Sequence, residues 1–323
     1  MTNFQVYKKT LPFSFLNFFV GILELLLVAG LATIGFFVMN KTTDRALIGL
    51  AMGLILGILL LIPIHLLVVN RIKAAQIGMM AIGVVDGVLP DNIVSEGFKE
   101  VKGRFARITV FFIVTGAIKG IFRQLGRALN KLGTAVGGDA GNAVTSVIDT
   151  GIQTVIGYLC DCCLGWVMYN KNKGVGEAAC EGAVIFFKHG KTLIRNIGRI
   201  FGMGILSIVV IGGAFFGLSY VIFMNFPTMF EDLAKEITEF GTRNDIDIAN
   251  FIKDPMTLRI VVCAIIGVVF WSLLHSLLIR PFILVGVLRN FMKSGLEEKI
   301  SDADFDLLAS KSPKFQKLRN RAI

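Results

Sequence analysis

The chain has 323 residues, a formal net charge of +10, 54% hydrophobic and 17% charged residues, and a mean hydropathy of +0.71. Soluble domains carry about a quarter charged residues, so the composition excludes an ordinary soluble enzyme or binding domain. The charges are also segregated, and the uncharged runs exceed the roughly 18–20 residues that a membrane-spanning helix needs. We therefore expect an all-α, polytopic membrane helical bundle.

The first predicted hairpin covers residues 1–70, with spans near 11–39 and 46–70. Its first apolar stretch contains one charged residue, Glu24. At about 28 residues this stretch is too long for the apolar core of a signal peptide, so we expect it to remain as the first span. Residues 71–103 mix apolar and polar positions, which favours a cytoplasmic amphipathic connector lying in the membrane interface.

The second predicted hairpin, residues 104–170, is the polar one. Its outgoing helix carries four cations spaced four residues apart, which places them on one stripe: Lys119, Arg123, Arg127 and Lys131. Its returning helix carries Asp149 and Asp161. An antiparallel register centred on residue 140 pairs Lys131 with Asp149 and Lys119 with Asp161, and it leaves Arg123 and Arg127 without an acid.

Three interpretations of this stripe stay open, because charges at membrane depth need a cavity, headgroups or partners. The stripe could line a pathway for an anion. It could instead hold the phosphates of anionic lipids at the interface. Finally, Lys119 and Asp161 could form a structural ion pair that fixes the register of the hairpin.

Residues 171–199 form a second amphipathic connector, and residues 200–290 the third hairpin, with an outer amphipathic insertion at 226–257. Within its second span, Arg280 is a further candidate for the pathway. His275 of the same span and His65 of the first hairpin are candidates for a proton relay. The commoner role of such a histidine is a hydrogen bond to a neighbour. Residues 291–323 form a charged cytoplasmic tail that we expect to be partly disordered.

Two short motifs recur in the three hairpins, which suggests an internal repeat. The opening motif pairs Gly21 with Glu24, Gly116 with Lys119 and Gly204 with Ser207, and the closing motif pairs Asn70 with Lys73, Asn170 with Lys173 and Asn290 with Lys293. The alternative is that Asn and Lys simply favour the positions where helices leave the membrane. If the repeat is real, Glu24 and Lys119 occupy equivalent positions with opposite charge, and near a pseudo-threefold axis they could meet as a buried ion pair.

The positive charge is concentrated at one predicted membrane face. Of 33 Lys and Arg residues, 22 fall within 1–10, 71–107, 171–200 and 289–323. By the positive-inside rule these segments are cytoplasmic, so both termini lie inside and the number of spans is even. We expect six spans in a plasma or inner membrane, and this orientation explains the charge better than nucleic-acid binding does.

The cysteines and the enzyme motifs give little support for catalysis. The five cysteines form no disulfide framework. The cluster of Cys160, Cys162 and Cys163 could be a lipidation or metal site, or these could be small apolar residues packed between helices. No His-Glu-x-x-His or Gly-x-Ser-x-Gly motif occurs in the sequence. We therefore expect no cofactor, no bound metal and no enzymatic activity.

The segment from Asp161 to Arg199 contains Cys162-Cys163, Tyr169-Asn-Lys-Asn172, Cys180 and Arg195-Asn196-x-x-Arg199. This run resembles the choline-transporter-like family, whose members carry a Cys-rich stretch, an Asn-x-Asn pair and a later Asn-x-x-Arg before a span. The intervals differ, and the large extracellular domain of that family is missing. The resemblance implies a solute or lipid-related transporter with cytoplasmic amphipathic helices.

Two functions follow as hypotheses. The first is a transport pathway or channel for a small solute, with an anion as the candidate. The second is a non-transporting scaffold or subunit of a larger membrane complex that binds anionic lipids through the basic stripe. In both, the partners are membrane lipids and further copies or membrane subunits, and a membrane-embedded enzyme ranks third.

Overall fold

The structure is a computed structural model that describes residues 1–43, 45–104, 108–109, 111–112, 115–116, 118–121, 142–194, 197–243 and 253–322. At 142–153, 190–194, 197–201 and 321–322 the description covers the backbone alone. Every regular element among the described residues is a helix, which confirms the all-α prediction.

The chain divides into two compact units that alternate along the sequence. Unit 1 comprises Met1–Leu16, Val68–Gly202 and Arg280–Ile323, and unit 2 comprises Asn17–Leu67 and Met203–Ile279. Each unit is therefore built from segments that lie far apart in sequence.

Among the described residues, four helical stretches are long and apolar enough to cross a membrane: Asn3–Thr43, Ala46–Val85, Gly202–Met224 and Pro255–Glu297. These helices agree with the prediction of an all-α membrane fold, but the described residues provide four candidate spans and not the six predicted. Within predicted hairpin two, the fully described part of helix α6 (Asn142–Tyr169) contains a shorter apolar stretch, Thr154–Tyr169. Residues 158–168 are also buried without interruption, so protein rather than lipid covers this part of α6.

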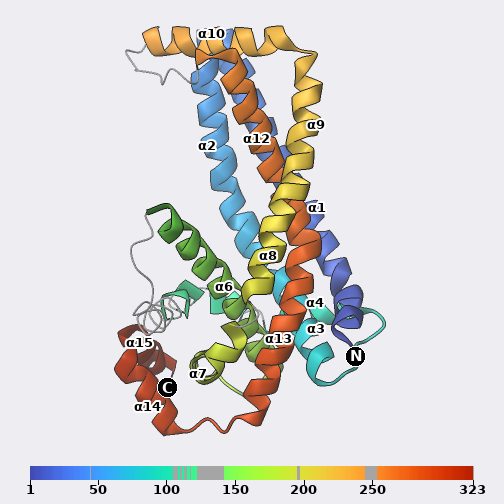
Figure 1. Ribbon diagram of the computed structural model, residues 1–323, viewed down its shortest axis with the longest axis vertical. Coiled ribbons are helices and arrows are strands. Elements are labelled where there is room, and N and C mark those ends of the chain that lie inside the picture. The colour runs from blue at the N-terminus through green and yellow to red at the C-terminus, as the bar shows by residue number, and fades with distance from the viewer. Residues whose placement is uncertain are drawn as a thin grey trace. The chain divides into compact units, whose positions relative to one another are not determined.

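Unit 2 contains most of α1 (Asn3–Thr43) together with α2 (Ala46–Ile64), α9 (Gly213–Met224), α10 (Pro227–Arg243) and α12 (Pro255–Leu274). Its long helices run alongside one another, and α10 lies across the end of α9 and α12 (Figure 1). The segment α10 begins at Pro227, within the expected outer insertion, and buries Phe230 and Ala234 against Leu258 of α12.

Glycines set the distance between α1 and α2. A Cβ on Gly53 would lie 2.2 Å from the carbonyl oxygen of Leu31, and one on Gly35 would lie 2.1 Å from that of Gly49. The two backbones are therefore in direct contact, as in membrane helices that pack through small residues.

Short π-helical segments interrupt three of the long helices. They are η1 (His65–Val69), η3 (Ile208–Gly212, after α8, Ile197–Ser207) and η4 (His275–Ile279). The helix nevertheless continues past each, so the expected exit position at Asn70 is not a helix end: η1 passes directly into α3 (Asn70–Val85). Likewise η4 passes into α13 (Arg280–Glu297), which extends beyond Asn290.

Unit 1 is organised around α3, which contacts α4 (Ile93–Lys102), α6 and α13, while α7 (Val175–Ile194) packs against α6 and α13. Of the 16 residues of α3, 11 are buried, so this helix is a core element and not the interfacial connector expected for 71–103. A helix that is apolar on all sides needs cover on all sides. Its one buried polar residue, Gln76, donates to Ser14 Oγ at 2.7 Å.

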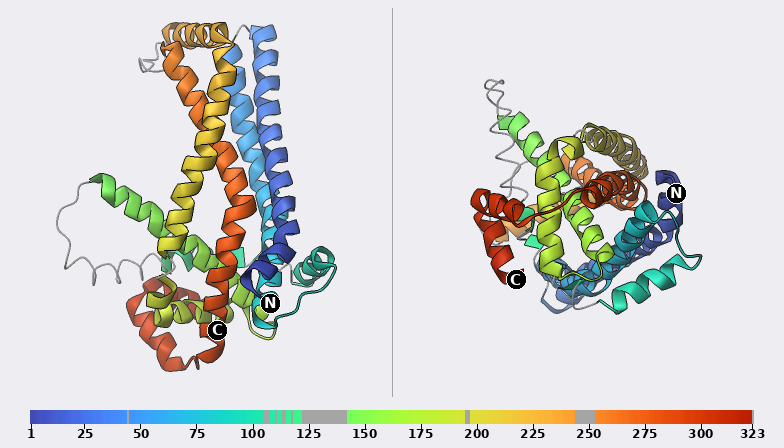
Figure 2. Two further views of the ribbon diagram at one scale, coloured as in Figure 1. Left: turned by 45° about the vertical axis from the view of Figure 1, so that its right-hand side comes forward. Right: turned by 90° about the horizontal axis from the view of Figure 1, so that it is seen from below.

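The expected disordered tail forms two helices, α14 (Asp302–Lys311) and α15 (Pro313–Ala322). Both pack beside α7 (Figure 2). Phe315 is fully buried, as is Leu308, and Leu318 is nearly so. The hydrophobic side chains that anchor this tail are few and widely spaced, which is why composition alone favours disorder.

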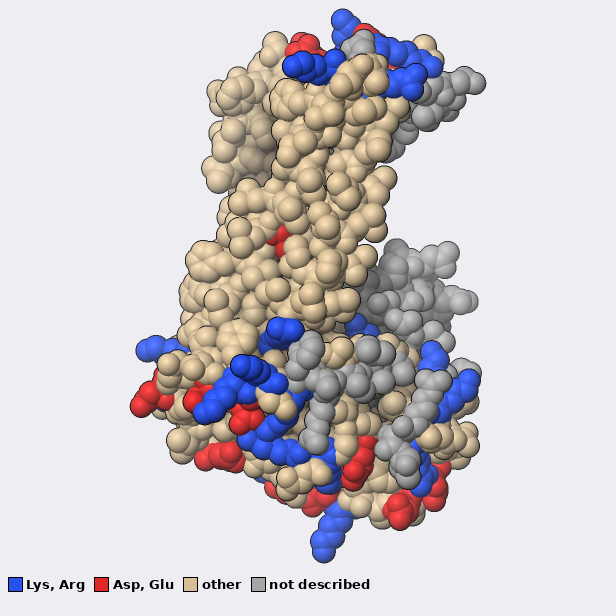
Figure 3. Space-filling model, turned by 180° about the vertical axis from the view of Figure 1, so that it is seen from behind, with Lys and Arg blue, Asp and Glu red and all other residues tan. Residues whose placement is uncertain are grey.

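The two units differ in surface charge. In unit 1, Lys and Arg alternate with Asp and Glu over most of the visible face (Figure 3). In unit 2, the long helices are almost free of charge, and the charged residues gather at the end that bears α10 (Figure 3).

Candidate functional site

A buried carboxylate with two cations lies at the centre of unit 1. Asp161 of α6 is 2% exposed. Its Oδ1 lies 2.5 Å from Lys73 Nζ of α3, and its Oδ2 accepts a hydrogen bond of 2.8 Å from Arg280 Nη2 at the start of α13. The three helices that contribute these residues pack against one another. We call this set the Asp161 cluster.

The Asp161 cluster carries one surplus positive charge. A buried carboxylate is tolerated when cations and hydrogen bonds compensate for its lost hydration, and here each oxygen has its own cation. The side chains of Lys73 and Arg280 remain 29% and 42% exposed, so the cations reach from the carboxylate to the surface of the bundle. A second anion near Arg280 would therefore meet a net positive field.

The structure brings some of the predicted site residues together and separates others. Asp161 and Arg280 meet, although the sequence analysis assigned them to different hairpins. Lys119, the partner expected for Asp161, is exposed, and Lys73 and Arg280 fill that position instead. Arg123, Arg127 and Lys131 lie outside the described residues, and Asp149 is described by its backbone alone.

In the sequence, Lys73 stands out only as part of the recurring Asn-Lys motif. In the structure the lysine of each motif lies beside an acid: Lys73 beside Asp161, Lys173 beside Glu181, and Lys293 at 3.9 Å from Glu297. Glu181 is itself buried and accepts a hydrogen bond of 3.0 Å from Trp166 Nε1. The pairings differ in kind, since only Lys73 joins helices distant in sequence.

In unit 2, a second polar pair lies within apolar helices. Glu24 of α1 is 18% exposed, and its Oε1 lies 3.8 Å from Nδ1 of His65, the first residue of η1. This distance is too long for a hydrogen bond, and among the described residues Glu24 Oε1 has no hydrogen-bond partner. A proton on His65 would convert the contact into an ion pair.

The corresponding place in the other hairpin of unit 2 has related geometry. Ser207 accepts a hydrogen bond of 2.9 Å from Trp271 Nε1, and the Trp271 ring lies 5.3 Å from that of His275, the first residue of η4. Each histidine follows, by eight positions, a glycine at a helix contact: Gly57 precedes His65, and Gly267 precedes His275. Because π-helical segments are frequent at functional sites, both histidines stay candidates for a proton relay.

The cysteines are packing residues in the described structure. Cys160, Cys162, Cys163 and Cys180 are all buried, and Cys163 lies against Gly182 of α7. Burial raises the pKa of the Cys180 thiol to about 12, which removes the thiolate that modification and metal binding require. Among the described residues no group of His, Cys, Asp and Glu is arranged to hold a metal ion.

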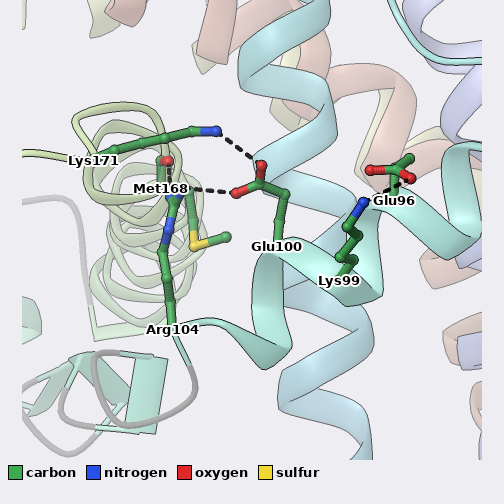
Figure 4. Close-up of polar contacts among 6 residues, drawn as sticks. All are labelled: Glu96, Lys99, Glu100, Arg104, Met168 and Lys171. Atoms are coloured by element: carbon green, nitrogen blue, oxygen red, sulfur yellow. Dashed lines mark hydrogen bonds and ion pairs between the residues drawn. The ribbon is translucent and has the colours of Figure 1, made fainter.

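A polar clamp fixes α4 to the end of α6 (Figure 4). Glu100 accepts hydrogen bonds from Arg104 Nη2 at 2.6 Å and from Lys171 Nζ at 2.8 Å, and Arg104 Nη1 donates to the carbonyl of Met168 at 2.6 Å. Partial burial favours a higher pKa for Glu100, but the hydrogen bond from Lys171 and the charges of both cations prevail and lower this pKa. The clamp thus satisfies a carbonyl that the C-terminus of α6 would leave without a partner.

Comparisons of the chain with protein-family models, with curated proteins and with solved structures gave no match.

Proposed function

We propose that this integral membrane protein provides a passage for a small anionic solute, and that the Asp161 cluster contributes the positive field that attracts it. The observation that carries the proposal is the surplus charge of the cluster: one fully buried carboxylate faces two cations on neighbouring helices. Ionisable residues within membrane proteins are rare because they are costly, and they usually mark a functional site.

The position of Arg280 supports this role. Its guanidinium uses Nη2 to bond Asp161, and 42% of the side chain is exposed. A planar guanidinium can bind a second oxyanion through its remaining N–H groups, and Lys73 adds charge from the other side of Asp161. Arg280 also follows a π-helical segment directly, and helix interruptions are common at transport sites.

The experiment is an anion-flux assay in proteoliposomes, with Arg280→Gln as the test variant. Lys73 still compensates Asp161 in this variant, so we expect a folded protein in which flux or anion selectivity is reduced about tenfold or more, because a hydrogen bond to a charged group contributes about 1.5–3 kcal/mol. Lys293→Gln is the matched control, because the Lys293 side chain is 73% exposed and has only a 3.9 Å contact to Glu297. Flux that is absent in the unaltered protein, or equal in both variants, would refute the proposal.

A second candidate is a membrane scaffold that docks a partner on its charged end. The observation in its favour is the ordered tail, since α15 presents the exposed residues Lys314 and Lys317 on a helix that packs against α7. A scaffold would show no flux, and removing residues 298–323 would release its partner from solubilised membranes. A passage would retain flux after the same truncation.

A further inference from the structure

A groove of about 650 Å³ lies in unit 1 between the start of α1 and the turn that follows α3. The α1 wall presents Gln5, Lys8, Lys9 and Pro12, which share one side of the helix because they lie three to four residues apart or adjacent. The opposite wall includes Val88 and Leu89. The groove lies apart from the Asp161 cluster, none of whose residues line it.

Both walls are fixed by hydrogen bonds, so the groove exists before any ligand arrives. Arg289 of α13 donates to the carbonyls of Met1 at 2.8 Å and Val84 at 3.4 Å, which ties the start of α1 to the end of α3. At the other side, Tyr169 Oη donates to Asp86 at 2.8 Å. The turn then proceeds through Gly87, whose φ of +71° few other residues adopt without strain. A preformed site avoids the entropy of ordering its walls on binding.

The charges of the groove favour an anion. Lys8 and Lys9 are both exposed and lie within one turn of helix, against the single carboxylate of Asp91 on the opposite wall. Lys9 Nζ lies 3.5 Å from the carbonyl oxygen of Leu89, which places its ammonium across the groove. Because both lysines line the groove, their flexible ammonium groups can contact one phosphate.

The rest of the groove suits an acyl chain. Val88 is 71% exposed, and Pro12 adds apolar surface on the α1 side of the same groove. Lys8 and Lys9 are also the last charged residues before the apolar run that starts at Leu11. Lysines at such a boundary lie at the level of the lipid headgroups.

We propose that this groove binds one anionic phospholipid, whose phosphate contacts Lys8 and Lys9 and whose acyl chain lies over Pro12 and Val88. The site is independent of the proposed passage. A soluble phosphate compound would use the two lysines but would gain nothing from the apolar surface of Val88, whereas a zwitterionic lipid would use Val88 but gain less from the two cations.

The test is a lipid titration of the purified protein followed by native mass spectrometry, with phosphatidylglycerol and phosphatidylcholine of identical acyl chains. We expect preferential binding of phosphatidylglycerol. Lys8→Gln combined with Lys9→Gln should weaken it roughly 30-fold, since each lysine near an anionic surface contributes about a factor of five. The control removes two exposed lysines elsewhere, through Lys41→Gln and Lys235→Gln, and should bind the lipid as the unaltered protein does.

Two further arms keep the result interpretable. Val88→Asn removes apolar surface without changing the charge of the groove and should also weaken phosphatidylglycerol binding, while Lys8→Arg with Lys9→Arg should retain it. Equal binding of both lipids, or equal loss in the control, would overturn the proposal. Displacement of the lipid by millimolar inorganic phosphate or glycerol phosphate would also overturn it, because the ligand would then be a soluble anion.

Discussion

The Asp161 cluster makes a quantitative prediction about non-additive stability. Lys73→Gln leaves Asp161 with Arg280 at 2.8 Å, and Arg280→Gln leaves it with Lys73 at 2.5 Å. A hydrogen bond to a charged group contributes about 1.5–3 kcal/mol, and both cations are partly exposed, so we expect each single variant to lose about 1–2 kcal/mol. The two single variants should therefore fold.

In the double variant, the Asp161 carboxylate has neither cation although its side chain is only 3% exposed, so its charge is buried without compensation. An uncompensated buried charge costs about 3–5 kcal/mol. Asp161 can escape this cost by taking up a proton, which at pH 7 costs about 4 kcal/mol for a carboxyl with the usual pKa near 3.9. We expect the double variant to lose about 4 kcal/mol, which is about 1 kcal/mol more than the sum of the two single variants.

Adding Asp161→Asn to the double variant should restore stability, since it removes the unpaired charge and keeps the side-chain volume. The assay is thermal or SDS unfolding in detergent at pH 7 and pH 5. The defect of the double variant should shrink by about 1.4 kcal/mol for each pH unit of acidification, because protonation becomes cheaper. Additive losses, no rescue by Asp161→Asn, or a pH-independent defect would refute the assignment of both cations to Asp161.

Two further predictions concern the tail and the contact between α1 and α2. Lys188 pairs with Glu298 at 2.9 Å and with Asp304 at 2.7 Å; these contacts lower the pKa of Glu298 below 4.5 and that of Asp304 from 3.8 to about 2. Because both folded-state pKa values are depressed, the stabilisation of the tail by these ion pairs is complete above about pH 5 and is lost between pH 4.5 and 2. Hydrogen exchange of α14 would detect this loss. Unchanged protection of α14 at pH 2.5 would contradict the prediction. Gly53→Val should destabilise the contact between α1 and α2 by about 1–3 kcal/mol or more, because its Cβ would lie 2.2 Å from a backbone oxygen. A Cβ on Gly30 would meet nothing within 4 Å, so the control variant Gly30→Ala should be neutral in the same thermal assay.

The amino-acid sequence by itself determined that this is an all-helical membrane protein. Long uncharged runs can satisfy their backbone in a bilayer only as helices, and Pro227 with apolar residues at helical spacing was enough to place α10. The sequence also singled out Asp161 and Arg280, because charges are conspicuous where most residues are apolar.

The tertiary structure decided which apolar helices meet protein instead of lipid. Hydropathy measures the transfer of side chains out of water, and it does not distinguish a bilayer from a protein interior. For this reason α3 and the apolar part of α6, which are core helices, resemble membrane segments in composition. The partners of Asp161 were undetermined for a related reason. Lys73 lies on a helix that precedes α6 in the sequence, and Arg280 lies on one that follows it. Which helices become neighbours depends on packing, and the spacing of residues in the sequence does not reveal it. The same holds for the tail. Its order depends on the burial of Phe315 and on the ion pair between Lys188 of α7 and Asp304 of α14.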